Sequence, residues 1–140
     1  MSKDKARARR GSEMPSGWNE ESTTFGEVKK RIREFLEERE WTHAHSPKNL
    51  AMSIAVESAE LMEIFQWIDS TQAYAYAREN PDRFLHVRQE VADVVIYCFS
   101  MASALGFDLA AAIDEKIDNN ASRYPATQRG HRGAKGGNGA

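Results

Sequence analysis

Two stretches decide the fold of this chain: NLAMSIAVESAELMEIFQWIDS at residues 49–70 and PDRFLHVRQEVADVVIYCFSMASALG at residues 81–106. Both have the apolar periodicity of a helix, about 100° per residue. Each stretch also carries two acids, three residues apart, on or beside its apolar stripe. An unpaired carboxylate on such a face costs several kcal/mol or changes its pKa. We therefore expect a cation to join the four acids, which are Glu57 and Glu60, and Glu90 and Asp93.

The length and charge of the chain define a single domain between two tails. With 140 residues and 41% hydrophobic content, the chain can bury one core. Residues 1–22 carry five Lys/Arg and are expected to form a flexible basic tail, and residues 126–140 hold five glycines and are expected to form a flexible Gly-rich tail. Residues 23–125, the predicted domain, have 11 Lys/Arg against 17 Asp/Glu, a net charge of −6. This acidic body argues against stable nucleic-acid binding, but it allows a phosphate ligand if divalent cations lie between the two.

Several protein classes are excluded by what the sequence lacks. The single cysteine, Cys98, rules out an internal disulfide framework and a cysteine-based zinc site. No stretch reaches 18 apolar residues, and the N-terminus has no signal-peptide core. We therefore expect a cytoplasmic protein with no membrane association.

The fold class predicted by these patterns is all-α, a four-helix bundle. Thr24 and Glu27 form a capping box, Ser46–Pro47 and Asn80–Pro81 resemble helix starts, and Gly106 is a typical residue after a helix end. Residues 69–78 are open to two interpretations, a short helix or a loop. The four predicted helices cover about residues 24–40, 47–68, 81–105 and 109–123.

The spacing of the four acids predicts a metal site. Side chains three residues apart are neighbours on one helix face, so two antiparallel helices would converge four carboxylates. All-oxygen ligation suits Mg²⁺, with Mn²⁺ as the alternative ion. Glu63, one turn further along, either joins the site or orients water. The alternatives are surface salt bridges and a di-iron bundle. The di-iron bundle requires E-x-x-H motifs, and no histidine stands three residues after any of these glutamates.

Several motifs together resemble one family, over about residues 24–125. E-S-A-E (57–60) followed by E-V-A-D (90–93) is similar to the signature of the MazG-like all-α nucleotide pyrophosphohydrolases. The dCTP pyrophosphatase branch is indicated by the surrounding motifs. These are E-W (40–41), H-x-P-K-N-L (45–50), E-L-M-E-I-F-Q-W (60–67), D-V-V-I-Y (93–97) and K-I-D-x-N-x-x-R-Y-P (116–125). Two departures are the connection at residues 69–83 and Ile32, where that branch leads us to expect a histidine.

This resemblance implies a Mg²⁺-dependent enzyme of nucleotide pool sanitation. It would hydrolyse a (deoxy)nucleoside triphosphate, dCTP or a modified pyrimidine analogue, to the monophosphate and pyrophosphate. The implied metal ligands are Glu57, Glu60, Glu90 and Asp93, with Glu63 added as a catalytic residue. The implied substrate-binding residues are Trp41, His45, Asn49, Trp67, Tyr97, Lys116, Asn120, Arg123 and Tyr124. Core packing is the alternative for the two tryptophans, and Arg123 and Tyr124 could simply fasten the end of their helix.

The predicted helix at residues 47–68 is apolar around most of its circumference. Three neighbouring helices in so short a chain cannot easily cover it. We therefore expect a homo-oligomer, a tetramer by resemblance, with active sites near subunit interfaces. A second functional hypothesis is a non-catalytic helical adaptor whose acids bind a structural cation or a basic partner.

Overall fold

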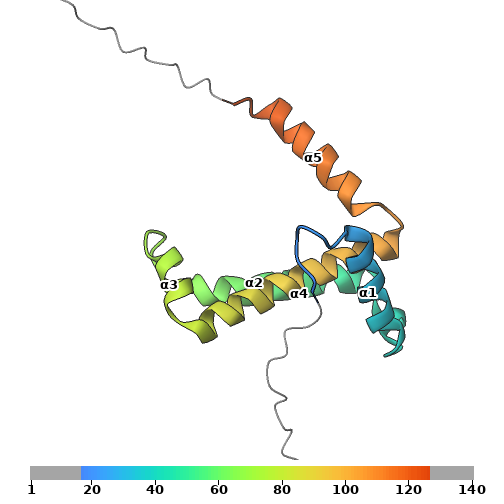
Figure 1. The fold of residues 1–140 in the computed structure, drawn as a ribbon, viewed down its shortest axis with the longest axis horizontal. Coiled ribbons are helices and arrows are strands. Elements are labelled where there is room, and N and C mark those ends of the chain that lie inside the picture. The colour runs from blue at the N-terminus through green and yellow to red at the C-terminus, as the bar shows by residue number, and fades with distance from the viewer. Residues whose placement is uncertain (1–16, 127–140) are drawn as a thin grey trace, which may run out of the picture.

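The computed structural model describes residues 17–126, and this part of the chain contains helices and no strands. The all-α prediction is thereby confirmed. The predicted tails lie mostly outside the described residues, at positions 1–16 and 127–140. In chain order the elements are α1 (Phe25–Glu37), the 3₁₀ turn η1 (Trp41–Ala44), α2 (Pro47–Phe65), α3 (Ala73–Glu79), α4 (Pro81–Leu105) and α5 (Leu109–Arg123) (Figure 1).

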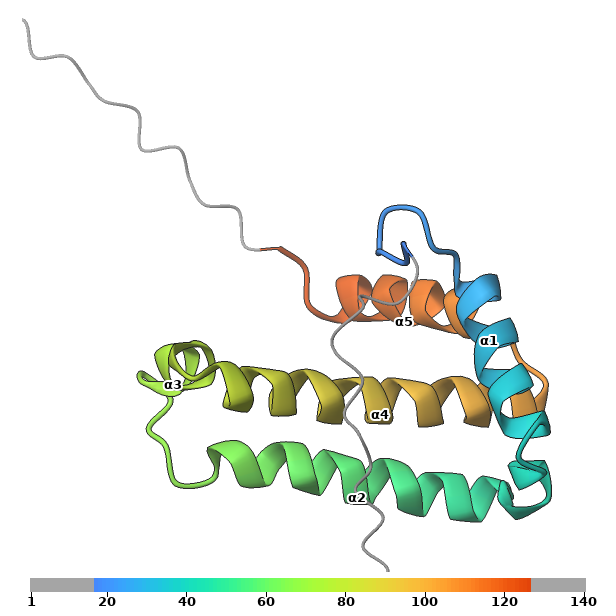
Figure 2. The same ribbon diagram turned by 60° about the horizontal axis from the view of Figure 1, so that its bottom comes forward.

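The centre of the molecule is the antiparallel pair of α2 and α4, which lie side by side along their length (Figure 2). Helix α1 packs near the C-terminal end of α4, where the Phe25 and Phe99 rings lie 5.3 Å apart. The buried apolar side chains are concentrated at this end of the pair. They are Leu36, Leu50, Phe99 and Ala102. The opposite end is closed by α3, which connects α2 to α4 and packs on α4.

The predicted helix starts are confirmed by their caps. The Thr24 hydroxyl accepts from the Glu27 amide, and the Glu27 carboxylate accepts from the Thr24 amide at 2.7 Å. Ser46, Asn80 and Asp108 accept a backbone N–H in the same way at the starts of α2, α4 and α5. Helix α4 ends at Gly106, whose φ of 74° is a left-handed conformation that glycine adopts at no steric cost.

Two helix ends differ from the sequence prediction, and the segment left open takes a defined structure. Helix α1 ends at Glu37, short of residue 40, because Glu40 has a φ of 55° and turns the chain into η1. Helix α2 ends at Phe65, three residues early. The segment that allowed two interpretations forms both structures: the Asp69 carboxylate accepts from the Thr71 amide in a turn, and α3 follows.

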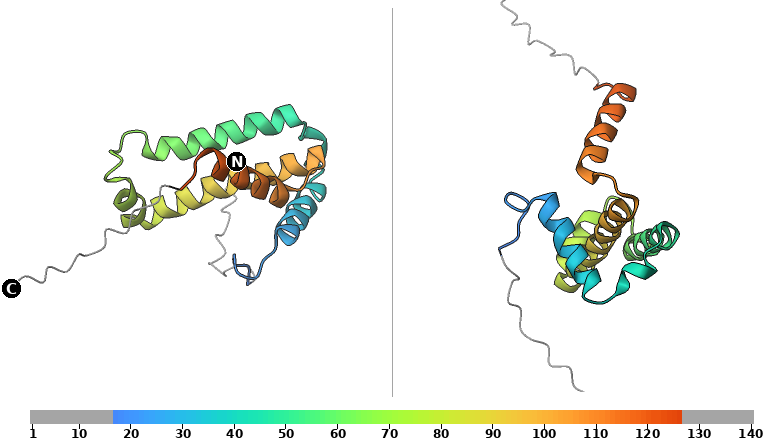
Figure 3. Two further views of the ribbon diagram at one scale, coloured as in Figure 1. Left: turned by 90° about the horizontal axis from the view of Figure 1, so that it is seen from above. Right: turned by 90° about the vertical axis from the view of Figure 1, so that its right-hand side faces the viewer.

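Helix α5 is oriented differently from the other long helices. It is bent by 105° from α4 and extends away from α1, α2 and α4 (Figure 3). The bundle of a single chain therefore contains α1, α2 and α4, and the fourth predicted helix lies outside it. No single helix among residues 17–126 is long and apolar enough to cross a membrane; α4 and α5 pass that test only as a bent pair.

Candidate metal centre and adjoining pocket

Three of the four predicted metal ligands meet between α2 and α4. Glu57 on α2 and Glu90 and Asp93 on α4 each offer a carboxylate oxygen, and these oxygens lie within 4.8 Å of one another. They meet because Glu57 lies on the face of α2 that packs against α4, and because E-x-x-D spacing keeps the other two acids on one face of α4. We refer to these three residues as the acid cluster.

The acids of this cluster repel one another when no cation is bound. The pKa of Glu57 is raised above its usual value of 4.5, mainly because partial burial disfavours the charged form. Neighbouring negative charges raise it further, in decreasing order those of Glu60, Asp93 and Glu90. A bound cation would favour the charged carboxylate and so oppose both causes.

Glu90 shows most directly that a cation fits here. This residue is only 7% exposed, and its Oε1 lies 2.9 Å from His86 Nε2. Its Oε2 is buried and has no hydrogen-bond partner within the described part of the chain. A buried charged oxygen without a partner is costly, and a divalent cation would satisfy it. The all-oxygen donor set suits a hard ion such as Mg²⁺ or Mn²⁺.

Glu60 and Glu63 lie beside the acid cluster and outside it. Both are exposed, and both line a pocket of about 580 Å³ near α3. Ile64, Tyr76, Asp82, Arg83 and His86 complete the lining of this pocket. Glu60 is close enough to Glu57 to raise its pKa. Its role as a fourth ligand, like the catalytic role of Glu63, stays a prediction.

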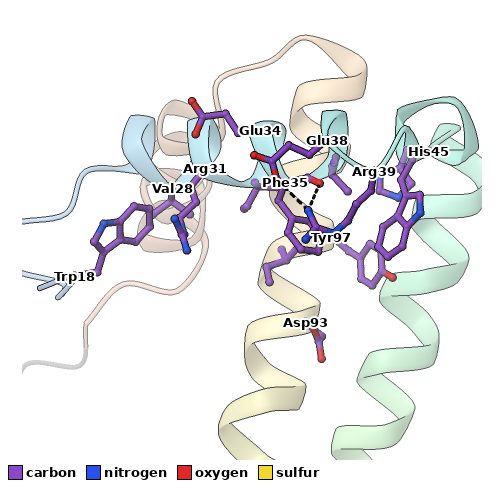
Figure 4. Close-up of a pocket in the computed structure, with 14 residues that line it drawn as sticks. Trp18, Val28, Arg31, Glu34, Phe35, Glu38, Arg39, His45, Asp93 and Tyr97 are labelled. Atoms are coloured by element: carbon purple, nitrogen blue, oxygen red, sulfur yellow. Dashed lines mark hydrogen bonds and ion pairs between the residues drawn. The ribbon is translucent and has the colours of Figure 1, made fainter. Parts of the chain in front are cut away.

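A larger pocket of about 660 Å³ opens between α1, η1 and α4, and Asp93 is part of its lining (Figure 4). Its aromatic side chains come from all three elements. Phe35 and Trp41 meet edge to face with ring centres 5.8 Å apart, and the His45 and Tyr97 rings lie 6.3 Å apart. Trp41, His45 and Tyr97 were predicted to bind substrate, so the structure brings these three together beside one acid of the cluster.

Sequence reasoning missed Phe35 and Arg39 in this pocket. The Arg39 guanidinium lies 3.8 Å from the centre of the Phe35 ring, donates to the Phe35 carbonyl at 3.0 Å and pairs with Glu38 at 3.2 Å (Figure 4). The helical spacing of α1 places Phe35 on the apolar face of the helix, a position that is equally typical of a core residue. Only the position of η1 shows that Phe35 lines a cavity.

Two other predicted substrate-binding residues lie elsewhere. Trp67 follows the end of α2, is 87% exposed and is absent from the lining of the large pocket. Its exposure also contradicts the core-packing alternative for this residue within one chain. The Asn49 amide donates to the Ala44 carbonyl at 2.9 Å and so fastens η1 to the start of α2.

The predicted substrate-binding residues of α5 are not near the acid cluster in a single chain. Lys116, Asn120, Arg123 and Tyr124 are all exposed on the helix that extends away from the bundle (Figure 1). Their contacts are local: the Tyr124 amide donates to the Asn120 carbonyl at 2.8 Å, and the Arg123 guanidinium lies 5.8 Å from the Tyr124 ring. These contacts agree with the fastening role that was the alternative for Arg123 and Tyr124.

Comparison with known proteins shows similarity to one family and to several of its relatives. The model of the MazG-like family matches residues 52–138. The chain is 34% identical over 102 residues to dCTP pyrophosphatase 1 of Mus musculus, covering 73% of this chain and 59% of that protein. It is 33% identical over 103 residues to dCTP pyrophosphatase 1 of Homo sapiens, covering 74% and 60%. The chain thus spans about three fifths of the length of these curated relatives.

A solved structure is similar over a larger share of its own length. The crystal structure of a pyrophosphatase from Archaeoglobus fulgidus superposes with a TM-score of 0.67 at 36% sequence identity. The match covers 72% of this chain and 92% of the archaeal chain. Shared identity at this level accompanies a shared fold, so the arrangement of α2 and α4 has a direct counterpart among solved structures.

Proposed function

Because the chain belongs to the MazG-like family, we propose that it is a Mg²⁺-dependent pyrophosphohydrolase of nucleoside triphosphates. It converts a (deoxy)nucleoside triphosphate to the monophosphate and pyrophosphate, in the sanitation of the nucleotide pool. The similarity to dCTP pyrophosphatases supports dCTP, or a modified pyrimidine analogue, as the substrate. The observation that carries the proposal is the acid cluster, which adjoins an aromatic pocket through Asp93.

The acid cluster is the part of the site that handles the phosphates. A triphosphate is strongly anionic and is repelled by three carboxylates, so the two associate only through cations. Glu57, Glu90 and Asp93 would hold Mg²⁺, with Mn²⁺ as an alternative ion and Glu60 as the proposed fourth ligand. When bound, Mg²⁺ would neutralise the charge of the triphosphate and polarise the bond that is cleaved.

The aromatic pocket is the part of the site that holds the nucleoside. Its Phe35 and Trp41 rings can contact a planar base, and His45 and Tyr97 can hydrogen-bond to base or sugar. With Asp93 in the lining of the same pocket, a nucleoside placed there directs its phosphates towards the acid cluster. Binding of the base thereby orients the bond to be hydrolysed.

We further propose that the enzyme is a homo-oligomer, with a tetramer as the specific expectation, and that α5 acts on the site of another copy. Ile113 and Ile117 are exposed on α5, at 42% and 59%. At helical spacing they share a face with Lys116 and Asn120. A face that is apolar and also carries ligand-binding side chains is suited to cover a second copy and to place a cation near its phosphates.

The test is a panel of nucleoside triphosphates and their deoxy forms, assayed for released pyrophosphate with Mg²⁺ and with EDTA. We expect pyrophosphate only with Mg²⁺, and the highest kcat/KM for dCTP or a modified dCTP. Release of orthophosphate instead would contradict the reaction type. If no nucleotide is hydrolysed at all, the non-catalytic adaptor becomes the better hypothesis.

A further inference from the structure

We propose that His86 is a positioning residue for the metal ligand Glu90, an inference that rests on the proposed metal site. His86 lies on α4, one turn before Glu90. Its Nε2 is 2.9 Å from Glu90 Oε1, and in such a contact the imidazole N–H faces an oxygen that only accepts. The E-x-x-D motif includes Glu90 and Asp93 but does not extend to position 86.

The two oxygens of Glu90 have different surroundings. Oε1 is occupied by His86, whereas Oε2 is buried with no hydrogen-bond partner among residues 17–126. The 2.9 Å contact of His86 with one oxygen restricts the rotation of the carboxylate and leaves the other oxygen free for a cation. Side chains in contact with a metal ligand commonly orient it, and the loss of such a partner weakens metal binding about 10–100-fold.

Among the side chains of the smaller pocket, His86 is the one in contact with Glu90. Its ring lines the smaller pocket together with three acids, Glu60, Glu63 and Asp82, but its 2.9 Å contact is with Glu90. Arg83, which also lines this pocket, is engaged elsewhere. Its guanidinium lies 3.6 Å from the centre of the Tyr76 ring and donates to the Tyr76 carbonyl. Arg83 therefore does not compete for Glu90.

The experiment is a titration of the nucleotide-free protein with Mn²⁺, followed by the electron paramagnetic resonance signal of the free ion. We expect His86→Leu to weaken Mn²⁺ binding about 10–100-fold. His86→Gln should restore most of the affinity, because its amide places an N–H donor at a similar reach. His43→Leu is the matched control: His43 is exposed in η1, and the variant should bind Mn²⁺ like the wild type. Since the His86 side chain is 55% exposed, all three variants should fold, which thermal melting checks.

Each outcome either supports or overturns the role of His86. Unchanged Mn²⁺ binding by His86→Leu would overturn it and leave the proposed function standing. Hyperfine coupling to a directly coordinated imidazole nitrogen in the wild type would also overturn it, by making His86 a ligand. If the wild type itself binds no Mn²⁺, the proposed metal site fails, and the positioning role fails with it.

Discussion

The pair of α2 and α4 and the helix α5 carry their polar side chains in the same way, yet only the pair assembles a site within the chain. In both regions the polar groups lie on an apolar face: Glu57 and Glu90 between the paired helices, Lys116 and Asn120 beside Ile113 and Ile117. The face of α2 meets α4, so its acid is brought against two others. Among residues 17–126, the face of α5 meets no other helix to a comparable extent.

An apolar face with embedded polar groups specifies a contact but does not specify the partner. The face predicts that something will cover it, because exposing it to water costs free energy. It does not specify whether the cover is another helix of the same chain or a second copy. Variants of each region, made separately and then together, distinguish these two possibilities.

The largest loss of activity is expected from substituting one key residue in each region. Glu90→Gln keeps the shape of the acid and removes its charge, so pyrophosphate release should fall on the order of 10³-fold, because a ligand to the ion contributes several kcal/mol. Lys116→Ala should lower activity by about 10–100-fold, the value of a charge-assisted contact to phosphate. Glu79→Gln on α3, outside both pockets, is the control and should leave kcat/KM unchanged.

Combining the two defective variants tests whether α5 acts on another copy. Coexpressed Glu90→Gln and Lys116→Ala chains would form mixed oligomers in which one kind of site has an intact acid cluster from one copy and an intact α5 from the other. Random pairing of two chains then restores roughly a quarter of the wild-type sites. Activity no greater than the mean of the separate variants would place α5 on the site of its own chain.

A smaller effect on KM is expected from the tryptophans, of which one lies in the large pocket and the other on the surface. Trp41 lines the large pocket beside Phe35, whereas Trp67 is 87% exposed. Stacking of a base on an aromatic ring contributes roughly 1–3 kcal/mol, so Trp41→Ala should raise KM for dCTP about tenfold and narrow discrimination between dCTP and dATP. Trp67→Ala should change KM less and leave the melting temperature nearly unaltered.

Kinetics with both nucleotides and thermal melting of both variants check this expectation. An equal rise in KM for dCTP in the two variants would show that Trp67 reaches a nucleotide in the assembled protein, as the sequence motif predicted. A large loss of melting temperature in Trp41→Ala with an unchanged dCTP/dATP ratio would assign Trp41 to packing instead.

The parts of the structure that could be predicted from sequence depend on local interactions. The capping residues Thr24, Ser46, Asn80 and Asp108 all bond to amides within three residues, so the helix starts could be predicted. Convergence of Glu57 with Glu90 and Asp93 was also predictable, because the segment between α2 and α4 is short enough to make them antiparallel neighbours.

The parts that could not be predicted depend on how separate elements pack. The bend of 105° between α4 and α5 follows Gly106, which allows many directions and specifies none. The large pocket needs η1 placed against α1, and that placement starts from the left-handed Glu40. His86 gave no signal in sequence because a histidine four residues before a glutamate is common on helix surfaces, and only the burial of Glu90 shows its importance.

The smallest expected effect concerns the stability of the metal-free protein. In the folded chain the pKa of Glu57 is raised above 4.5, so the folded state holds this proton more tightly than the unfolded state. The stability that Glu57 contributes is therefore fully present below about pH 4.5. It is lost as the pH rises through the raised pKa. Glu57→Gln cannot lose a proton and should melt at a higher temperature than the wild type at neutral pH in EDTA.

Two controls separate this effect from a general change in charge. At pH below 4.5 the advantage of Glu57→Gln should disappear, because the wild-type carboxyl is protonated there in both states. Glu79→Gln removes the same charge from α3 and should show no such pH dependence. With Mg²⁺ the order should reverse at neutral pH, since a cation that binds only the folded wild type stabilises it by mass action. A wild type that melts above Glu57→Gln in EDTA at neutral pH would mean that repulsion in the acid cluster is already relieved without a metal.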